Sequence, residues 1–380
     1  MKKAMTSCWL LPLAAVGCGV DAPTGLDLEY DHGTLSEYRS ALPSEERLVV
    51  AVPSAASDGS MQHANPAAVL AAQGVVFAQG VNETARDIAG TLHALAQEAP
   101  DSFSPTQERF RWGPWQNPTG RGEMTLEIQR TPGAEHELRY ELARQMPERP
   151  ETRTVVLWGA ATPDLEDASR SSGFTALDLD ANTTFELEHG GSQRALIGQG
   201  RFAIAYGHTT RADASVQLNL AAFRGFIPPS EGSDSELLPL SVDHFYGRVA
   251  EASGTVVDFL QANVEQDLCG SSPETCFDNP SGSHPERLAF GEFFVDSGLG
   301  RADVALSGGD LGSQLQLSEC WNASLTRTSY RMTTTAGDQQ MMPQPSCAGR
   351  AALAFSEQGL PTRADVPEWL TEALTLATDR

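Results

Sequence analysis

Two runs decide the fold class of this chain: Glu123-Met-Thr-Leu-Glu-Ile-Gln129 and Glu137-Leu-Arg-Tyr-Glu-Leu142. In both, apolar and polar residues alternate with a period of two, which is the pattern of a β-strand with one dry and one wet face. The turn residues Thr131-Pro-Gly-Ala134 lie between them. The two runs are therefore predicted to form a hairpin.

Further alternating runs follow as far as about residue 335, separated by turn residues. They occur at Leu177 and Leu179, Phe185 and Leu187, Phe202 to Tyr206, Val216 to Leu220, Ala302 to Leu306, and Leu315 and Leu317. Many short strands in succession favour antiparallel pairing between neighbours. The predicted fold class is α+β but mainly β, with a large antiparallel up-and-down sheet that is half-barrel or barrel-like.

An amphipathic helix near residues 66–98 is predicted to pack on this sheet. Its apolar residues recur at helical spacing on one stripe, namely Phe77, Val81, Ala85, Ile88, Leu92 and Leu95. This spacing is typical of a helix with one buried face. Gly74 and Gly80 weaken the pattern. Leu48 to Val52 is expected to form a first strand.

Residues 1–17 have the features of a signal peptide, with basic Lys2 and Lys3 followed by a short apolar segment. The run Leu13-Ala-Ala-Val-Gly-Cys18 resembles the lipobox of bacterial lipoproteins, which predicts that Cys18 carries the lipid anchor. Two or more acyl chains hold a protein stably at a bilayer. With Gly19 next, the expected location is the bacterial outer membrane, facing the periplasm or the cell surface. An ordinary secretory signal is the alternative.

The rest of the chain is expected to have three parts. Residues 18–45 are acidic and rich in turn residues, so they are predicted to be a lipidated flexible tether. Residues 46–360 are predicted to form a single β-rich domain with the helix at its N-terminal end. Residues 361–380 are predicted to form a short C-terminal helix.

Charge and lysine content exclude several functions. The chain has 26 Lys and Arg against 50 Asp and Glu, a formal net charge of −24. This balance opposes nucleic-acid binding, which depends on basic contacts to phosphates. Lys2 and Lys3 are the only lysines, so a mature chain without residues 1–17 has no P-loop or Schiff-base lysine. GxSxG and HExxH motifs are absent too, and we expect no enzyme and no cofactor.

The cysteines beyond Cys18 are predicted to form two disulfides, since their number is even in an exported chain. The favoured pairing joins neighbours along the sequence, Cys269 with Cys276 and Cys320 with Cys347, although other pairings are open. A zinc site is a weaker alternative because no CxxC or neighbouring His pair occurs. No metal site is predicted.

Three groups of residues offer alternative sites. The aromatic residues Phe110, Trp112, Trp115 and Trp158 could line a ligand groove, but core packing is the more common role of such a group. Asp178, Asp180 and Asn182 resemble half of a calcium loop that lacks the required Gly and Glu. A pair of carboxylates for hydrolysis could arise among the many acids, but no pair stands out.

A resemblance adds the compartment. The motifs Arg111-Trp-Gly-Pro-Trp115, Ser307-Gly-Gly-Asp-Leu311 and Glu319-Cys-Trp321 look like those of a family of uncharacterised predicted lipoproteins from myxobacteria. The likeness covers about residues 40–355, and it implies an envelope lipoprotein without implying an activity. A helix followed by an antiparallel meander is also similar, at fold level only, to the half-barrel lipoprotein carriers of the periplasm.

These observations predict a membrane-anchored envelope lipoprotein with a non-enzymatic structural or interaction role. Its membrane contact would be the lipid on Cys18, and an envelope protein would be its partner. One alternative is a carrier that holds a lipid or another apolar ligand in the concave face of the sheet. A hydrolase with paired carboxylates is the less favoured alternative.

Overall fold

A computed structural model describes most of the body of the chain. The described residues are 30–50, 69–117, 121–166, 170–191, 199–210, 214–227, 240–266, 286–295, 299–308, 314–334, 337–340 and 368. The predicted signal peptide, the lipidation site Cys18 and the C-terminal helix expected at 361–380 lie outside them, apart from Glu368.

The helices and strands follow each other in a simple order. The helices are α1 (His32–Ser40), α2 (Glu45–Leu48), α4 (Val69–Ala96) and α5 (Leu179–Glu188). The strands are β1 (Ser102–Phe103), β2 (Arg109–Gln116), β3 (Glu123–Arg130), β4 (Leu138–Met146), β5 (Arg149–Thr162), β6 (Ser172–Asp178), β7 (Gln199–Thr210), β8 (Ala214–Ile227), β9 (Leu240–Glu251), β10 (Val256–Gln266), β11 (Glu286–Val295), β12 (Gly300–Gly308), β13 (Leu315–Trp321), β14 (Arg327–Thr334) and β15 (Gly337–Gln340).

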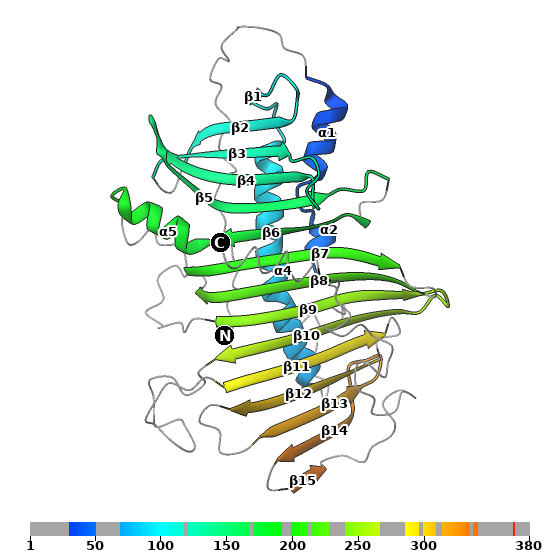
Figure 1. The fold of residues 1–380 in the computed structure, drawn as a ribbon. Helices are drawn as coiled ribbons and strands as arrows, with labels where there is room; N and C mark the ends of the chain where they lie inside the picture. Colours follow the sequence, from blue (N-terminus) through cyan, green and yellow to red (C-terminus); the bar gives the residue numbers. More distant parts are fainter. Residues whose placement is uncertain are drawn as a thin grey trace. The chain divides into compact units, whose positions relative to one another are not determined.

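The strands form an antiparallel up-and-down sheet. Their order in the sheet is their order in the sequence, from β1 to β15 (Figure 1). The sheet is not closed. The prediction of a mainly β fold with a large antiparallel meander and an amphipathic helix is therefore confirmed.

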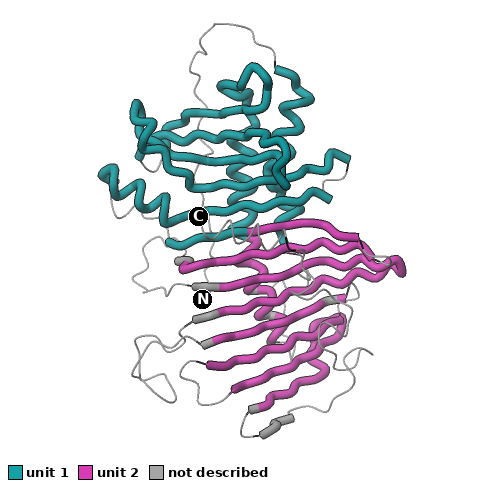
Figure 2. The backbone as a smooth tube through the Cα atoms, viewed as in Figure 1, with its two compact units in different colours: residues 1–49, 83–203, 228–233 teal, residues 50–82, 204–227, 234–380 magenta. Residues whose placement is uncertain are grey.

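The chain divides into two compact units, shown in different colours in Figure 2. Unit 1 contains residues 1–49, 83–203 and 228–233, and unit 2 contains the remainder. Helix α4 and strand β7 each contribute residues to both units. The single domain predicted for residues 46–360 stays a prediction.

In unit 1, one face of the sheet is apolar and buried. Register places Phe110 beside Ile128 and Ile128 beside Tyr140, so these side chains share a face. Tyr38 of α1 packs edge-on against Phe110, with ring centroids 4.9 Å apart. The opposite face carries ion pairs such as Arg153 with Glu141 at 2.8 Å.

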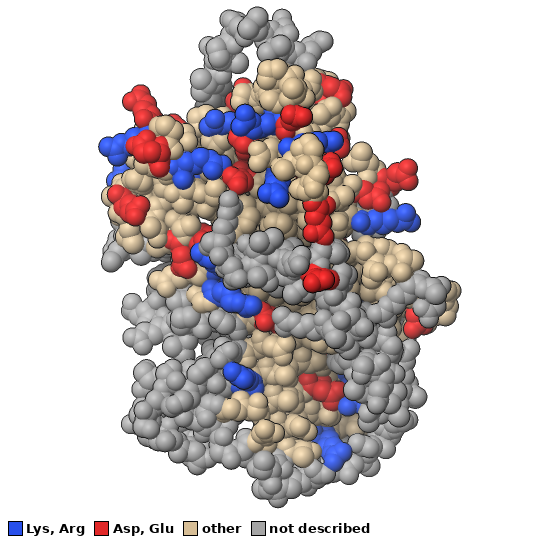
Figure 3. Space-filling model, viewed as in Figure 1, with Lys and Arg blue, Asp and Glu red and all other residues tan. Residues whose placement is uncertain are grey.

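Charged side chains of both signs are interspersed on the described surface seen in Figure 3. Besides the sheet pairs, Arg86 of α4 lies 2.6 Å from Glu45 of α2. Exposed pairs of this kind contribute little to stability, typically below about 1 kcal/mol each. These exposed charged side chains keep the surface hydrated.

In unit 2, strands β9 to β11 carry buried apolar side chains on both faces. Phe290 of β11 contacts Phe77 of α4, with ring centroids 5.2 Å apart, and residues 69–82 of α4 lie on this face. Phe245 and Phe259 point to the opposite face and contact each other at 5.3 Å. Both rings are buried. Strict alternation of apolar and polar residues is therefore lost in these strands.

Two glycines permit close packing on the sheet. A Cβ on Gly159 of β5 would overlap the ring of Tyr140, whose hydroxyl donates to the Phe174 carbonyl at 3.1 Å. A Cβ on Gly300 of β12 would overlap the ring of Trp321 on β13. The large aromatic side chains of Tyr140 and Trp321 are thus accommodated because the neighbouring glycines have no side chain.

Three sequence expectations are wrong in detail. The tether predicted for residues 18–45 does not extend over His32–Ser40, because α1 forms there and buries Leu35 and Tyr38. The strand expected at Leu48 to Val52 is not formed by its described residues, since Leu48 ends α2 and Val49 and Val50 are in no strand, while residues 51 and 52 lie outside the described part. Phe185 and Leu187 lie in helix α5 and not in a strand, because Asp178 caps a helix at this point.

Candidate functional site

The four aromatic residues proposed as a groove do not form one group, although the Phe110 and Trp112 rings are neighbours with centroids 6.4 Å apart. Phe110 and Trp112 of β2 are fully buried, and the Trp112 indole Nε1 donates to the Glu98 carbonyl at 2.9 Å. Trp158 of β5 is paired with Glu141, so it lies on the opposite face of the sheet. Trp115 follows a bulge in β2 and is partly exposed. Phe110 and Trp112 are therefore core residues and do not line a groove.

The motif Glu319-Cys-Trp321 lies on β13 of unit 2, beside polar residues of β12 and β14. Glu319 of β13 accepts from the Arg327 guanidinium of β14 at 2.5 Å. Arg301 and Asp303 of β12 form a double hydrogen bond at 2.7 and 2.8 Å. Ser318 donates to the same Asp303 at 2.5 Å. These residues therefore form two polar clusters, one on each face of β12 and β13.

The first cluster lies beneath the start of α4 and is the candidate functional site. We call Leu70, Glu292, Glu319 and Arg327 the Glu319 cluster. Glu319 is fully buried, and its second oxygen accepts from the Leu70 backbone N–H at 2.5 Å. The first N–H groups of a helix have no partner within the helix, and the helix dipole favours a negative charge there. Glu319 therefore satisfies this end of α4 and the Arg327 guanidinium together.

Glu292 of β11 is the second carboxylate of the cluster. Register places Glu292 beside Ala302 and Ala302 beside Glu319, so both carboxylates lie on the α4 face with one strand between them. Glu292 is fully buried, and neither of its oxygens has a hydrogen-bond partner in the described part of the chain. Burial, and then the charge of Glu319, raise the pKa of Glu292 well above its usual range. Burial thus favours the neutral form of Glu292 over the charged carboxylate.

A histidine lies on the same face, in the row of Phe290, which is two residues from Glu292 along β11. His244 of β9 is buried between Phe77 and Phe223, with ring centroids 6.2 and 5.8 Å away. Its Nδ1 has no hydrogen-bond partner in the described residues. Burial lowers the pKa of His244 to about 4, against a smaller opposing effect of Asp243. His244 is therefore neutral at physiological pH.

A polar pair lies on the same face as Glu292, in the row of residues that are paired with it across β8 to β11. Asn219 of β8 donates to the Tyr246 hydroxyl of β9 at 3.1 Å. Burial raises the pKa of Tyr246, and the bond from Asn219 opposes this only in part. In the described residues, the α4 face of unit 2 is therefore mainly apolar, and its buried polar groups are Asn219, His244, Tyr246, Glu292 and Glu319.

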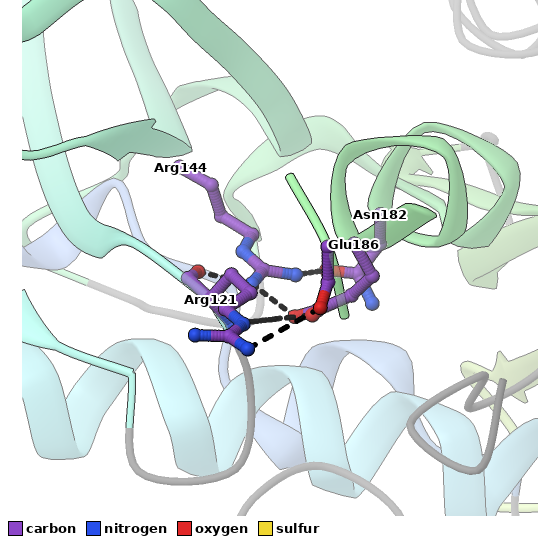
Figure 4. A network of polar contacts seen from close by, with 5 residues as sticks. Arg121, Arg144, Asn182 and Glu186 are labelled. Atoms are coloured by element: carbon purple, nitrogen blue, oxygen red, sulfur yellow. Dashed lines mark hydrogen bonds and ion pairs between the residues drawn. The ribbon is translucent and has the colours of Figure 1, made fainter. Parts of the chain in front are cut away.

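A buried ion pair in unit 1 forms a second polar network (Figure 4). Arg144 of β4 pairs with Glu186 of α5, and both side chains are only 2% exposed. Arg144 also donates to Asn182 Oδ1 at 2.6 Å and to the Arg121 carbonyl. The Arg121 N–H donates to Glu186 at 2.9 Å, and the Arg144 guanidinium lies 4.6 Å from the centre of the Phe185 ring. This network attaches α5 to the sheet, so its role is structural.

The residues that resemble half of a calcium loop have other partners. Asp178 is the N-cap of α5, accepting from the Ala181 N–H at 2.8 Å, and it also pairs with Arg201 at 2.9 Å. Asp180 accepts from the Gly200 N–H at 2.8 Å. Asn182 accepts from Arg144, as described above. These oxygens serve the helix terminus and the neighbouring chain.

Metal binding and disulfide formation depend on the cysteine, histidine and acidic side chains. Within the described residues, no three His, Cys, Asp or Glu side chains are grouped so that they could hold a metal ion. Cys320 of β13 is buried and disulfide-bonded. Cys269, Cys276 and Cys347 lie outside the described residues, so the pairing stays a prediction.

Sequence reasoning missed both carboxylates of the Glu319 cluster, although a signal was present. Glu319 shares the parity of Leu315, Leu317 and Trp321, so alternation alone places it on the apolar face. Glu292 interrupts an apolar strand in the same way, two residues after Phe290. An acid within an apolar stripe is the feature that identifies such a site.

Comparison with known proteins adds no relative. No family model, no curated protein and no solved structure matches the chain. The likeness to myxobacterial lipoproteins therefore stays a prediction. In the described part of the chain, no helix is both long and apolar enough to cross a bilayer.

Proposed function

We propose that this chain is a lipid-anchored lipoprotein of the bacterial outer membrane with a non-enzymatic structural role, acting with a protein partner of the envelope. The observation that supports it is that helix α4 covers one face of the sheet, which we call the inner face. Residues of α4 fill this face in each unit, with Ile88 and Leu92 buried in unit 1 and Ala71 and Ala78 buried in unit 2. A packed face of this kind favours a scaffold.

The carrier alternative needs space that these residues fill. A lipid carrier binds its ligand in an apolar cavity that buries most of the ligand. The described side chains of α4 instead contact those of the sheet, as Phe77 of α4 does with Phe290 of β11. A ligand would have to displace the helix to reach this face.

The hydrolase alternative needs accessible carboxylates. A glycosidase pair stands on either side of the scissile bond, with room for substrate. Glu292 and Glu319 share a face, but both are fully buried and Glu319 is bonded to Arg327 and Leu70. Neither carboxylate can meet a substrate in this conformation.

Crosslinking in the bacterial envelope tests the proposal. The wild-type chain and a Cys18→Ser variant would be expressed at native level, crosslinked in intact cells and purified under denaturing conditions. We expect one protein to be crosslinked to the wild type in stoichiometric amount and to be lost with Cys18→Ser, because the variant leaves the membrane. A wild-type chain that is recovered without a partner would contradict the scaffold role.

A ligand assay separates the carrier alternative. The protein purified from membranes would be extracted with organic solvent, and the extract analysed by mass spectrometry. We expect no apolar molecule at one copy per chain. A stoichiometric lipid would overturn the proposal in favour of the carrier.

A further inference from the structure

Among the described residues, the first half of α4 has polar contacts with unit 2 near each of its ends. At its start, the Leu70 N–H donates to Glu319 at 2.5 Å. At its end, the Asn82 side chain accepts from the Val50 N–H at 2.6 Å and donates to the Val50 carbonyl at 3.0 Å. Between these contacts, the helix packs on the sheet through small and apolar side chains, Ala71, Val75 and Ala78 among them.

Glu292 lies against the middle of this segment. A Cβ on Gly74 would overlap the Glu292 carboxyl group, so only glycine allows the helix to approach so closely. Neither Glu292 oxygen has a hydrogen-bond partner in the described part of the chain. Such a site accepts a neutral acid far more readily than a charged carboxylate.

In the described part of the chain, the arginines on the face of Glu292 are paired and His244 is neutral. The titratable or charged groups on this face of the neighbouring strands are His244, Tyr246 and Arg248 of β9, Asp258 of β10, Glu319 of β13, and Arg327 and Tyr330 of β14. Arg248 pairs with Asp258 at 2.7 Å and Arg327 pairs with Glu319 at 2.5 Å. Residues 69–82 contain no charged or titratable side chain.

Gly80 provides a weak point at the end of the segment. A Cβ there would meet no atom within 4 Å, so packing does not require a glycine. Glycine weakens a helix relative to alanine because it gains more backbone freedom on unfolding. The helix can therefore separate near residue 80 while residues 83–96 stay on unit 1.

We propose that residues 69–82 of α4 are a pH-released segment: when the Glu292 carboxyl loses its proton to water, this half of the helix leaves the sheet. The new charge lies in apolar surroundings on the same face as Glu319. It reaches water only when the segment, which includes Gly74, lifts away from Glu292. Protonation of Glu292 restores the contact, so the step is reversible. This device stands apart from the proposed scaffold role and would regulate access to the apolar face of unit 2.

Hydrogen–deuterium exchange of the full mature chain tests the device. Exchange of peptides from residues 69–82 would be divided by exchange of peptides from 83–96, because this ratio cancels the intrinsic pH dependence of amide exchange. We expect the ratio to rise about tenfold per pH unit above pH ~4.5, since opening then releases one proton, until the native Glu292 itself titrates.

Variants make the test specific to Glu292. Glu292→Gln has the shape of the neutral acid and should hold the ratio constant with pH; Glu292→Met, also unbranched, serves if the amide does not fold. Asp258→Asn is the matched control on the same face, and it should retain the wild-type pH dependence. A ratio that does not change with pH in the wild type, or that changes equally in Glu292→Gln, would overturn the proposal.

Discussion

Breaking the buried ion pair between Arg144 and Glu186 should be costly, whereas removing both partners should not. In Arg144→Met, the buried Glu186 carboxylate keeps, among the described residues, the Arg121 N–H bonds at 2.9 and 3.2 Å. The guanidinium also loses its bonds to Asn182 and the Arg121 carbonyl, and its contact with Phe185. Removal of one partner of a buried pair costs about 3–5 kcal/mol.

The double variant carries the sharper expectation. When Glu186→Leu is combined with Arg144→Met, no buried charge is left, and apolar replacements of such pairs are often neutral or stabilising. The double variant should therefore be more stable than the sum of the single changes predicts, with a coupling energy of about 2–3 kcal/mol. Urea unfolding followed by circular dichroism gives the free energy of unfolding of each variant.

An exposed pair provides the control. Arg153 and Glu141 lie 2.8 Å apart with side chains that are 43% and 28% exposed, so their coupling should stay below about 1 kcal/mol. If the Arg144 and Glu186 changes are additive, or if the exposed pair couples as strongly, the argument that burial makes the Arg144 network costly to break is refuted.

Three further predictions concern a buried histidine, a glycine and the lipid anchor. His244 has a pKa of about 4 in the folded chain and 6.5 as its ordinary value, so its stabilising effect is complete above pH 6.5 and is lost as the pH falls towards 4. His244→Leu should remove this loss, about 1.4 kcal/mol per pH unit, from unfolding free energies measured between pH 6.5 and 4; an unchanged slope would contradict the burial of a neutral ring. Gly159→Ala should destabilise the chain by about 1–3 kcal/mol in urea unfolding, because its Cβ overlaps the Tyr140 ring, while Gly80→Ala should not destabilise it. Cys18→Ser should abolish incorporation of labelled palmitate and move the chain from the membrane fraction to the soluble fraction; retention in the membrane would exclude Cys18 as the anchor.

The architecture could be predicted because two simple periods mark it. The alternation in Glu123–Gln129 and Leu138–Leu142 gave β3 and β4, and the spacing from Phe77 to Leu95 gave α4. Both patterns arise from a single buried face, which periodicity detects directly. The prediction of the sheet and the helix rests on this physical basis.

Helix α5 could not be predicted in the same way. Leu177, Leu179, Phe185 and Leu187 alternate like strand residues, but Asp178 accepts from the Ala181 N–H and starts a helix after β6. Leu187 is exposed, so the alternation there does not reflect burial. Here capping determines the local structure and the apolar pattern misleads.

The candidate site was hidden for a different reason. Contacts between residues far apart in sequence create it: Leu70 with Glu319, and Gly74 with Glu292. Alternation can place an acid on the apolar face, but it cannot show which helix residue will cover it. The same holds for Arg144 and Glu186, which register and helix docking bring together.

Native mass spectrometry of the protein purified from bacterial membranes tests the central claim most directly. A scaffold lipoprotein with a filled inner face should have the mass of a chain that begins at Cys18 and carries covalent acyl groups, and gentle activation should release no small molecule. A chain that retains residues 1–17 without acyl groups, or one that releases one apolar ligand per molecule, would contradict this account.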